Sequence, residues 1–125
     1  MDDQHRKEAG VAGEDAALEH LRKHGLKLLA RNYRCKAGEI DLIMLDGATL
    51  ALIEVRYRAD NSFGGAAASV TWRKQRRIIN AARYLIVTRA DLRRYPIRFD
   101  VAAVSPRAPG LRVEWIRHAF MADGS

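Results

Sequence analysis

The chain has 125 residues, of which 48% are hydrophobic and 30% are charged. These proportions are typical of a single globular domain, here spanning residues 1–125, and they exclude a low-complexity or collagen-like chain. The net charge of +7 favours polyanionic partners, nucleic acid first and anionic membranes second. With one cysteine, no apolar N-terminal segment and no run of about 18 apolar residues, we expect a cytoplasmic protein without disulfides, secretory signal or membrane span.

Residues 1–8 are polar, and we expect them to be disordered. A helix is predicted over Ala9–His24, where Leu18 and Leu21 belong to an apolar stripe at helical spacing. Glu14 falls on the same stripe. An inward carboxylate needs a partner such as a backbone N–H, a cation or a metal, although the helix dipole also favours a Glu in the first turn.

The centre of the sequence predicts three strands. The first is Leu26–Tyr33, and the next two are the apolar runs Glu39–Leu45 and Leu50–Arg56. Asp46 and Gly47 lie between these runs, and an Asp-Gly pair in that position is a strong signal for a β-hairpin. The unbroken apolar start of the third strand predicts that it is covered on both faces.

Two hairpin registers bring charged side chains together. A two-residue loop pairs Glu39 with Glu54 and Asp41 with Leu52, whereas a four-residue loop pairs Asp41 with Glu54 directly. In both registers these carboxylates and Arg56 share one face, and the Cβ atoms of Asp41 and Glu54 lie about 5 to 8 Å apart. Like charges on neighbouring strands are costly, and a hard divalent cation such as Mg²⁺ would offset that cost. The alternative is an edge hairpin with a solvated charged face.

Residues 59–69 are rich in Gly, Ala and Ser and predict a flexible loop. Phe63 within this loop either anchors a ligand or packs against the domain. A second helix follows, with Ser69 or Thr71 as its N-cap, and extends to about Val87.

The second helix has an apolar face and a basic first half. The apolar face consists of Trp72, Ile78, Ile79, Ala82, Leu85 and Ile86, and the cations are Arg73, Lys74, Arg76 and Arg77. Helical spacing places Lys74 at the edge of the buried face, with Arg73 and Arg77 pointing outward. The pattern fits either a solvated basic face or a phosphate-binding surface, to which Arg58 would also belong.

Two further strands are predicted, Arg98–Val104 and Leu111–Ile116, joined by a turn. Asp100 lies in the first of them, and we expect it to pair with an arginine such as Arg98 or Arg34. The order α-β-β-β-α-β-β predicts an α/β fold with one mixed central sheet of about five strands and helices packed on it.

Several motifs together resemble a known family. GEDAALEHL, RNYR, GEIDLI, IEVRYR, the helix WRKQRRI and RFDV are similar to the YraN family of small bacterial proteins, over about residues 8–120. An Asp followed by Glu-x-Arg on the next strand also resembles the core of the restriction-endonuclease-like fold, which usually reads Asp and then Asp/Glu-x-Lys. The resemblance implies that fold and kinship to archaeal-type Holliday junction resolvases.

The same resemblance implies a metal-dependent DNA endonuclease, with branched DNA as one substrate class. Asp41 and Glu54 would bind Mg²⁺ or Mn²⁺, with the backbone carbonyl of Val55 as a further ligand. Glu14 would reach the metal directly or through water. The metal would polarise the phosphodiester and activate a water molecule.

The chain departs from the family pattern where it has Arg56 in place of the lysine. Arginine stays protonated, so it cannot act as a base, but it can hold a phosphate oxygen. One hypothesis is that Lys74 takes the place of the missing lysine. The alternative function is a non-catalytic nucleic-acid-binding domain with a degenerate nuclease site, and a third is a protein-interaction domain. DNA is favoured over RNA, and analogy with junction enzymes implies a homodimer.

Overall fold

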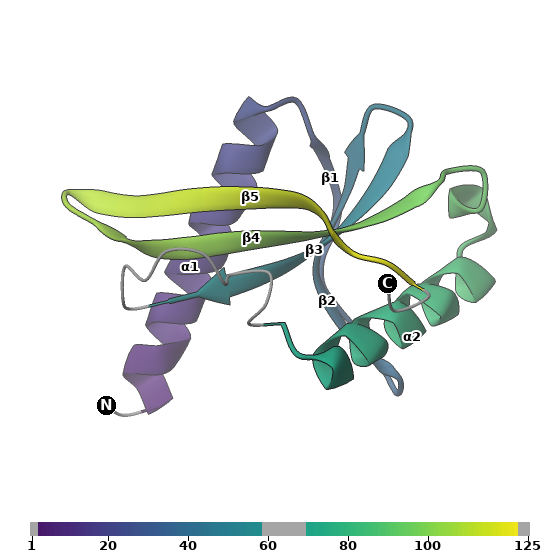
Figure 1. Ribbon diagram of the computed structural model, residues 1–125, viewed down its shortest axis with the longest axis horizontal. Helices are drawn as coiled ribbons and strands as arrows, with labels where there is room; N and C mark the ends of the chain where they lie inside the picture. The colour runs from purple at the N-terminus through teal and green to yellow at the C-terminus, as the bar shows by residue number, and fades with distance from the viewer. Residues whose placement is uncertain (1–2, 59–69, 123–125) are drawn as a thin grey trace.

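The computed structural model describes residues 3–58 and 70–122, with side chains from residue 10 onward. Its elements are α1 (Asp3–Lys23), β1 (Lys27–Cys35), β2 (Gly38–Asp46), β3 (Thr49–Tyr57), α2 (Trp72–Thr88), a 3₁₀ helix η1 (Ala90–Leu92), β4 (Ile97–Arg107) and β5 (Gly110–Phe120) (Figure 1). The predicted order of helices and strands is therefore confirmed. Phe63 and the alternative cap Ser69 lie outside the described residues.

The five strands form one mixed sheet in the order β1-β2-β3-β4-β5. β3 and β4 are parallel, and the other neighbouring pairs are antiparallel. Parallel strands need a crossover connection, and α2 lies in the one between β3 and β4. The arrangement confirms the predicted α/β fold with a mixed central sheet.

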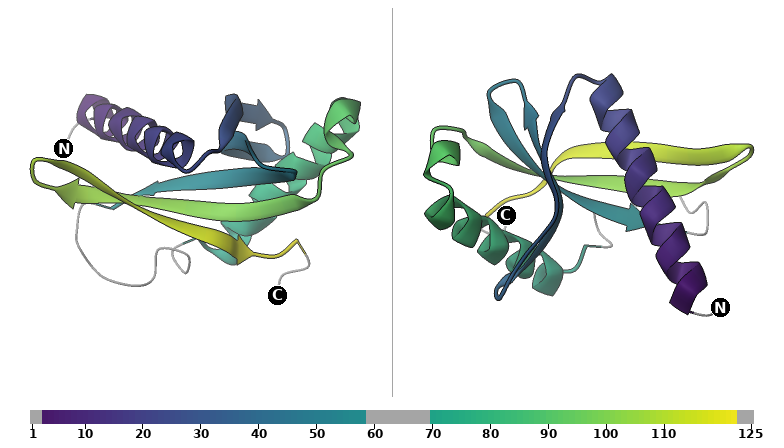
Figure 2. Two further views of the ribbon diagram at one scale, coloured as in Figure 1. Left: turned by 90° about the horizontal axis from the view of Figure 1, so that it is seen from above. Right: turned by 180° about the vertical axis from the view of Figure 1, so that it is seen from behind.

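The two helices pack against opposite faces of the sheet, and each face has its own apolar cluster (Figure 2). Ala17, Leu18 and Leu21 of α1 pack with Met44 and Ile53, among others. On the α2 side the buried set includes Ile43, Leu50, Leu52, Ile78, Ile79, Ala82, Leu85 and Phe99. Consecutive residues of β3 thus enter different clusters, which confirms that this strand is covered on both faces.

Element boundaries differ from the predictions where polar residues continue an element. α1 begins at Asp3, within the segment 1–8 that was expected to be disordered, because good helix formers extend a helix without apolar residues. β4 and β5 are likewise longer than predicted, and only Ala108 and Pro109 separate them. Backbone groups make the hydrogen bonds between strands, so polar side chains do not end the pairing. No helix in the described ranges combines the length and the apolar character required to cross a bilayer.

The prediction that Trp72 belongs to the apolar face of α2 is wrong. Its side chain is 68% exposed. Trp72 is the first residue of the helix, whereas Ile79, two turns later on the same side, is buried in the core. Thr71 is the N-cap, and its hydroxyl accepts a hydrogen bond from the backbone N–H of Lys74 at 3.2 Å.

Candidate active site where β2 and β3 separate

The hairpin register follows the second of the two predicted alternatives. Leu45 pairs with Leu50, and the pairing continues as far as Leu42 with Ile53. This register is the one that sets Asp41 opposite Glu54. The four-residue loop predicted with it is shortened to the two turn residues Gly47 and Ala48, because Asp46 and Thr49 also pair. Gly47 has φ +60°, as expected for the glycine that opens a type II′ turn.

Asp41 lies just beyond Leu42, the last residue of β2 that pairs with β3. Its Oδ2 accepts a hydrogen bond from the backbone N–H of Val55 at 2.8 Å, so a side chain supplies the acceptor where the strands separate. Burial, followed by the negative charge of Glu54, raises the pKa of Asp41 to about 7. Ionising this carboxyl group therefore carries a cost that a nearby cation would reduce.

The positive charge that offsets Glu54 comes from helix α2. Its side chain is 4% exposed, and Lys74 Nζ lies 2.9 Å from its Oε1. Lys74 also acts on Asp41, whose pKa its positive charge lowers. Glu54 therefore lies on the α2 side of the sheet, and Asp41 is close enough for the charges of both Glu54 and Lys74 to act on it. The hypothesis that Lys74 enters this site gains direct geometric support.

Because Gly38 has no side chain, α2 can approach β2 closely enough for Lys74 to reach Glu54. A Cβ atom at Gly38 would collide with the backbone carbonyl oxygen of Arg77. Arg77 is one turn after Lys74, so the glycine contact sets the depth at which the first turns of α2 sit on the sheet. The glycine of GEIDLI thereby helps to position a lysine that is distant in the sequence.

Glu14 finds its partners on β1. Arg31 Nη2 lies 2.8 Å from Glu14 Oε1, and Asn32 Nδ2 donates to the same oxygen at 3.1 Å. Hydrogen bonds to Glu14 and then Asp15 raise the pKa of Arg31. Glu14 remains near the site, since its charge is among the causes that raise the pKa of Asp41.

Sequence reasoning missed Arg31 and Asn32. They are 17 and 18 residues from Glu14, and no periodicity connects a helix position with a residue on a neighbouring strand. The only local signal is the polar type of Asn32, whose φ of 52° lies in the left-handed region that asparagine tolerates. This signal predicts a bend in the strand, and it does not identify the partner.

Arg56 carries an unsatisfied donor. Its Nε is buried and makes no hydrogen bond within the described part of the chain. Arg56 is two residues after Glu54 on β3, which places it on the same face as that carboxylate. An unpaired buried donor costs about 1–3 kcal/mol, so an anionic acceptor such as a phosphate oxygen would be stabilised here.

The basic start of α2 borders the carboxylates. Arg73 and Arg77 are exposed, as predicted, and the guanidinium of Arg76 lies against Trp72. A hollow of about 160 Å³ is lined by Glu39, Thr71, Arg73, Lys74, Arg77 and Ile78. Arg58, the residue after β3, donates its backbone N–H to Val104 O at 2.8 Å. Lys74 therefore belongs both to the basic surface and to the carboxylate site.

The donor atoms of the site fit a hard cation. Magnesium is commonly held by one or two carboxylates together with water and substrate phosphate, and Asp41 and Glu54 supply two such groups whose mutual repulsion a cation would relieve. Among the described residues, no three His, Cys, Asp or Glu side chains are arranged to hold one metal ion. The roles of Glu14 and of the Val55 carbonyl as further ligands remain predictions.

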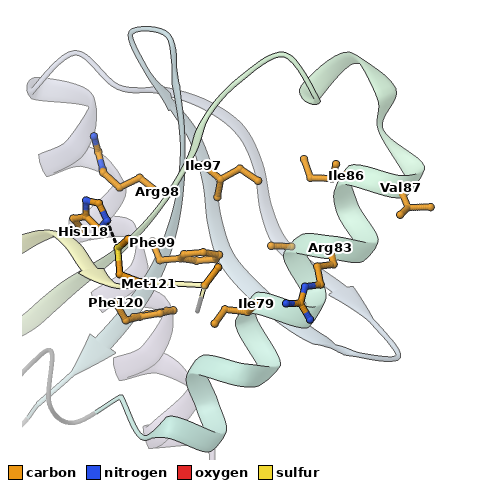
Figure 3. Close-up of a pocket in the computed structure, with 12 residues that line it drawn as sticks. Ile79, Arg83, Ile86, Val87, Ile97, Arg98, Phe99, His118, Phe120 and Met121 are labelled. Carbon is orange, nitrogen blue, oxygen red and sulfur yellow. Dashed lines mark hydrogen bonds between the residues drawn. The ribbon is translucent and has the colours of Figure 1, made fainter. Parts of the chain in front are cut away.

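A larger cavity lies elsewhere on the molecule (Figure 3). It measures about 530 Å³ between the second half of α2, the start of β4 and the end of β5. Its lining is mostly apolar and includes Ile79, Phe99 and Phe120, whereas the carboxylates and Lys74 take no part in it. This cavity is therefore separate from the candidate active site.

Comparison with known proteins gives consistent results along most of the chain. A family model described as "Uncharacterised protein family UPF0102" matches residues 13–104. A UPF0102 protein of Cupriavidus taiwanensis is 52% identical over 96% of this chain and 88% of its own length. One of Pseudomonas entomophila is 49% identical over 90% of this chain and 92% of its own. The matches include every residue of the candidate site from Glu14 to Lys74.

Proposed function

The chain belongs to the uncharacterised protein family UPF0102, the family its motifs indicated under the name YraN, and from this premise we propose that it is a metal-dependent endonuclease acting on DNA. One observation carries the proposal. Two carboxylates from adjacent strands, the half-buried Asp41 and the buried Glu54, come together beside Lys74 and a basic helix face. Such a combination suits a phosphodiester and a hard cation together.

The residues of the site divide the chemistry between them. Asp41 and Glu54 would hold Mg²⁺ or Mn²⁺, which when bound supplies Lewis-acid polarisation of the phosphate and a more acidic water. Hydrolysis forms a bond between the water oxygen and phosphorus and breaks the bond to the leaving oxygen of the neighbouring nucleotide. The protein must therefore hold the phosphate in place and balance the negative charge that develops on it.

Two cations are available for that task. Lys74 Nζ is 2.9 Å from Glu54, and an ammonium group has three N–H donors, so it can contact a phosphate oxygen while keeping this ion pair. Arg56 brings a buried Nε–H that has no acceptor among the described residues. We assign both side chains to phosphate binding and charge stabilisation rather than to proton removal from water.

A second function has an observation in its favour. The Lys74 ammonium already compensates Glu54 without a metal, and Arg56 stands where related nuclease sites carry a lysine. Both features fit a nucleic-acid-binding domain in which the acidic pair is structural. Such a domain would keep its DNA affinity in EDTA, with a strong dependence on salt concentration.

A cleavage screen separates the two functions. Purified protein is incubated with single-stranded, duplex, flap and four-way DNA in Mg²⁺, Mn²⁺ or EDTA, and metal binding is measured separately by calorimetry. We expect metal-dependent cleavage that Asp41→Asn abolishes and Lys74→Ala strongly reduces, with higher activity in Arg56→Lys. Lys23→Ala is the matched control, since it removes a lysine from an exposed ion pair with Glu19.

The proposal fails if neither metal binds and no substrate is cut while DNA affinity persists in EDTA. That result would establish the binding domain. If cleavage occurs but Arg56→Lys gains nothing and Lys74→Ala loses nothing, the nuclease function stands and the role of Lys74 is wrong.

A further inference from the structure

Trp72 lies at a position where its apolar side chain is not buried in the hydrophobic core. Its side chain is 68% exposed at the start of α2, whereas the buried residues of that helix begin at Ile78. The other tryptophan, Trp115, is partly buried and donates its indole N–H to Asp100 at 3.0 Å. The Trp72 indole therefore offers a large aromatic surface to solvent at the basic start of α2.

A cation accompanies this indole. Arg76 follows Trp72 by one helical turn, and its guanidinium carbon lies 5.8 Å from the ring centroid, which is within the range of a cation–π contact. The contact restrains the ring and adds positive charge beside it. An aromatic face next to arginine is the arrangement that favours stacking of electron-rich planar groups close to phosphate.

The groups that would bind a phosphate surround the same helical turn. Lys74 reaches Glu54 at 2.9 Å, and the hollow of about 160 Å³ next to it is lined by Arg73 and Arg77. Two residues of an α-helix span only about 3 Å along its axis. Around the axis the two side chains are about 200° apart, with Arg73 between them. A strand whose phosphates follow Lys74 and Arg73 around the first turn of α2 therefore reaches the Trp72 ring.

We propose that Trp72 is a stacking site for an unpaired nucleobase next to the phosphate held at Lys74, so that the protein selects strands with unpaired bases over continuous duplex. The inference rests on the nucleic-acid-binding part of the proposed function. In a duplex both faces of each base are covered by its neighbours, and a side chain can stack on the base only after it leaves the helix, which costs energy. An unpaired base in a single strand, flap or opened junction does not pay that cost.

Binding in EDTA tests the proposal. Fluorescence anisotropy is measured with labelled oligothymidylate of about 12 nucleotides, with oligouridylate of equal length, and with a mixed-sequence duplex. We expect Trp72→Ala to weaken binding to the single strands about 5- to 150-fold and to the duplex less than about twofold. Comparison of the two single strands tells whether the base comes from DNA or RNA.

Tyr84 provides the matched control, because it is an aromatic residue of the same helix, 51% exposed, in the half remote from Lys74. Tyr84→Ala should bind every probe as the wild type does. Equal losses on single strand and duplex in Trp72→Ala, or an equal loss in Tyr84→Ala, would overturn the proposal.

A fluorescence readout keeps the test decisive even where Trp72→Ala folds poorly. Oligothymidylate should quench tryptophan emission in the wild type and leave the emission of Trp72→Phe unchanged. The only tryptophan left in that variant is Trp115, whose indole is hydrogen-bonded to Asp100. Quenching that persists in Trp72→Phe would refute the stacking site. Since every measurement is made without metal, a protein that never cleaves DNA can still confirm the stacking site, and an active nuclease can still refute it.

Discussion

Asp100 in β4 and the Asp41–Glu54 pair are carboxylates of the same sheet, with Asp100 and Glu54 buried and Asp41 half-buried, and they differ in what surrounds them. Asp100 is fully buried, yet donors approach it from three residues. Arg98 binds its two oxygens at 2.8 and 2.9 Å, the Trp115 indole donates at 3.0 Å and the His118 backbone N–H at 2.9 Å. This carboxylate is compensated within the fold.

The Asp41–Glu54 pair has much less compensation. The hydrogen bonds and ion pairs of the described residues give Asp41 one donor, the N–H of Val55, and give Glu54 one cation, Lys74. Two negative groups thus share one ammonium, and burial together with Glu54 raises the pKa of Asp41. A carboxylate whose oxygens are hydrogen-bonded within the protein stabilises the fold. The Asp41–Glu54 pair has fewer donors and lies next to exposed cations, so it can still bind a ligand.

The largest expected effect is on catalysis. Asp41→Asn should lower metal-dependent cleavage by about 10³-fold, because several kcal/mol of transition-state stabilisation by the metal are lost. Rates are compared as kcat/KM in Mn²⁺. Asp91→Asn is the control, since Asp91 forms an exposed ion pair with Arg89, and its activity should match the wild type. Equal activity in Asp41→Asn would contradict the assignment of the site.

The second prediction concerns the stability of the compensated centre. Asp100→Ala leaves the partly buried Arg98 with Asp46 as its remaining carboxylate partner. Removing one member of a buried ion pair costs about 3–5 kcal/mol in the free energy of unfolding, measurable by urea denaturation. The fraction that stays folded should bind metal as the wild type does. A loss of stability below about 1 kcal/mol would mean that Asp100 is not a structural anchor.

The third prediction is a gain in stability at the under-compensated site. The pKa of Asp41 is raised from 3.8 to about 7 in the folded protein. Between these values the folded state binds more protons than the unfolded state, so the stability of the metal-free protein falls as the pH rises through this window. Asp41→Asn can still accept the Val55 hydrogen bond, and it should remove this slope and add roughly 2–4 kcal/mol at pH 8.

Chemical denaturation of the metal-free protein at several pH values measures this effect. Mg²⁺ should raise the melting temperature of the wild type above pH 7 and leave that of Asp41→Asn unchanged. Parallel pH profiles for the two proteins would show that Asp41 ionises in the folded state without extra cost.

The smallest effect is expected on the basic surface. Arg73→Ala should weaken DNA binding severalfold, to a similar degree for all sequences, and reduce the salt dependence of log K by about one unit of slope, because one phosphate contact is lost. Arg83→Ala on the second half of α2 is the control, since it removes an exposed arginine of the same helix that bonds to Asn80. Equal salt slopes in the two variants would exclude Arg73 from the interface.

Short-range patterns in the sequence predicted much of this arrangement. Of the two hairpin registers that the sequence offered, the one that sets Asp41 opposite Glu54 is the observed one. The apolar run Leu50–Ile53 predicted a strand covered on both sides. Asp100 was expected to pair with an arginine such as Arg98 or Arg34, and it pairs with Arg98. Such features depend on backbone periodicity, which can be read from neighbouring residues.

The sequence by itself therefore determined the element order, the central strand that is covered on both faces and the family to which the chain belongs. Only the tertiary structure decided that Lys74 meets Glu54, that Arg31 holds Glu14 and that Trp72 stays exposed. The physical reason is that these outcomes depend on how deeply and at what angle each helix docks on the sheet. Close contacts such as Gly38 with Arg77 set that docking, and they join residues whose separation in the chain follows no repeating pattern.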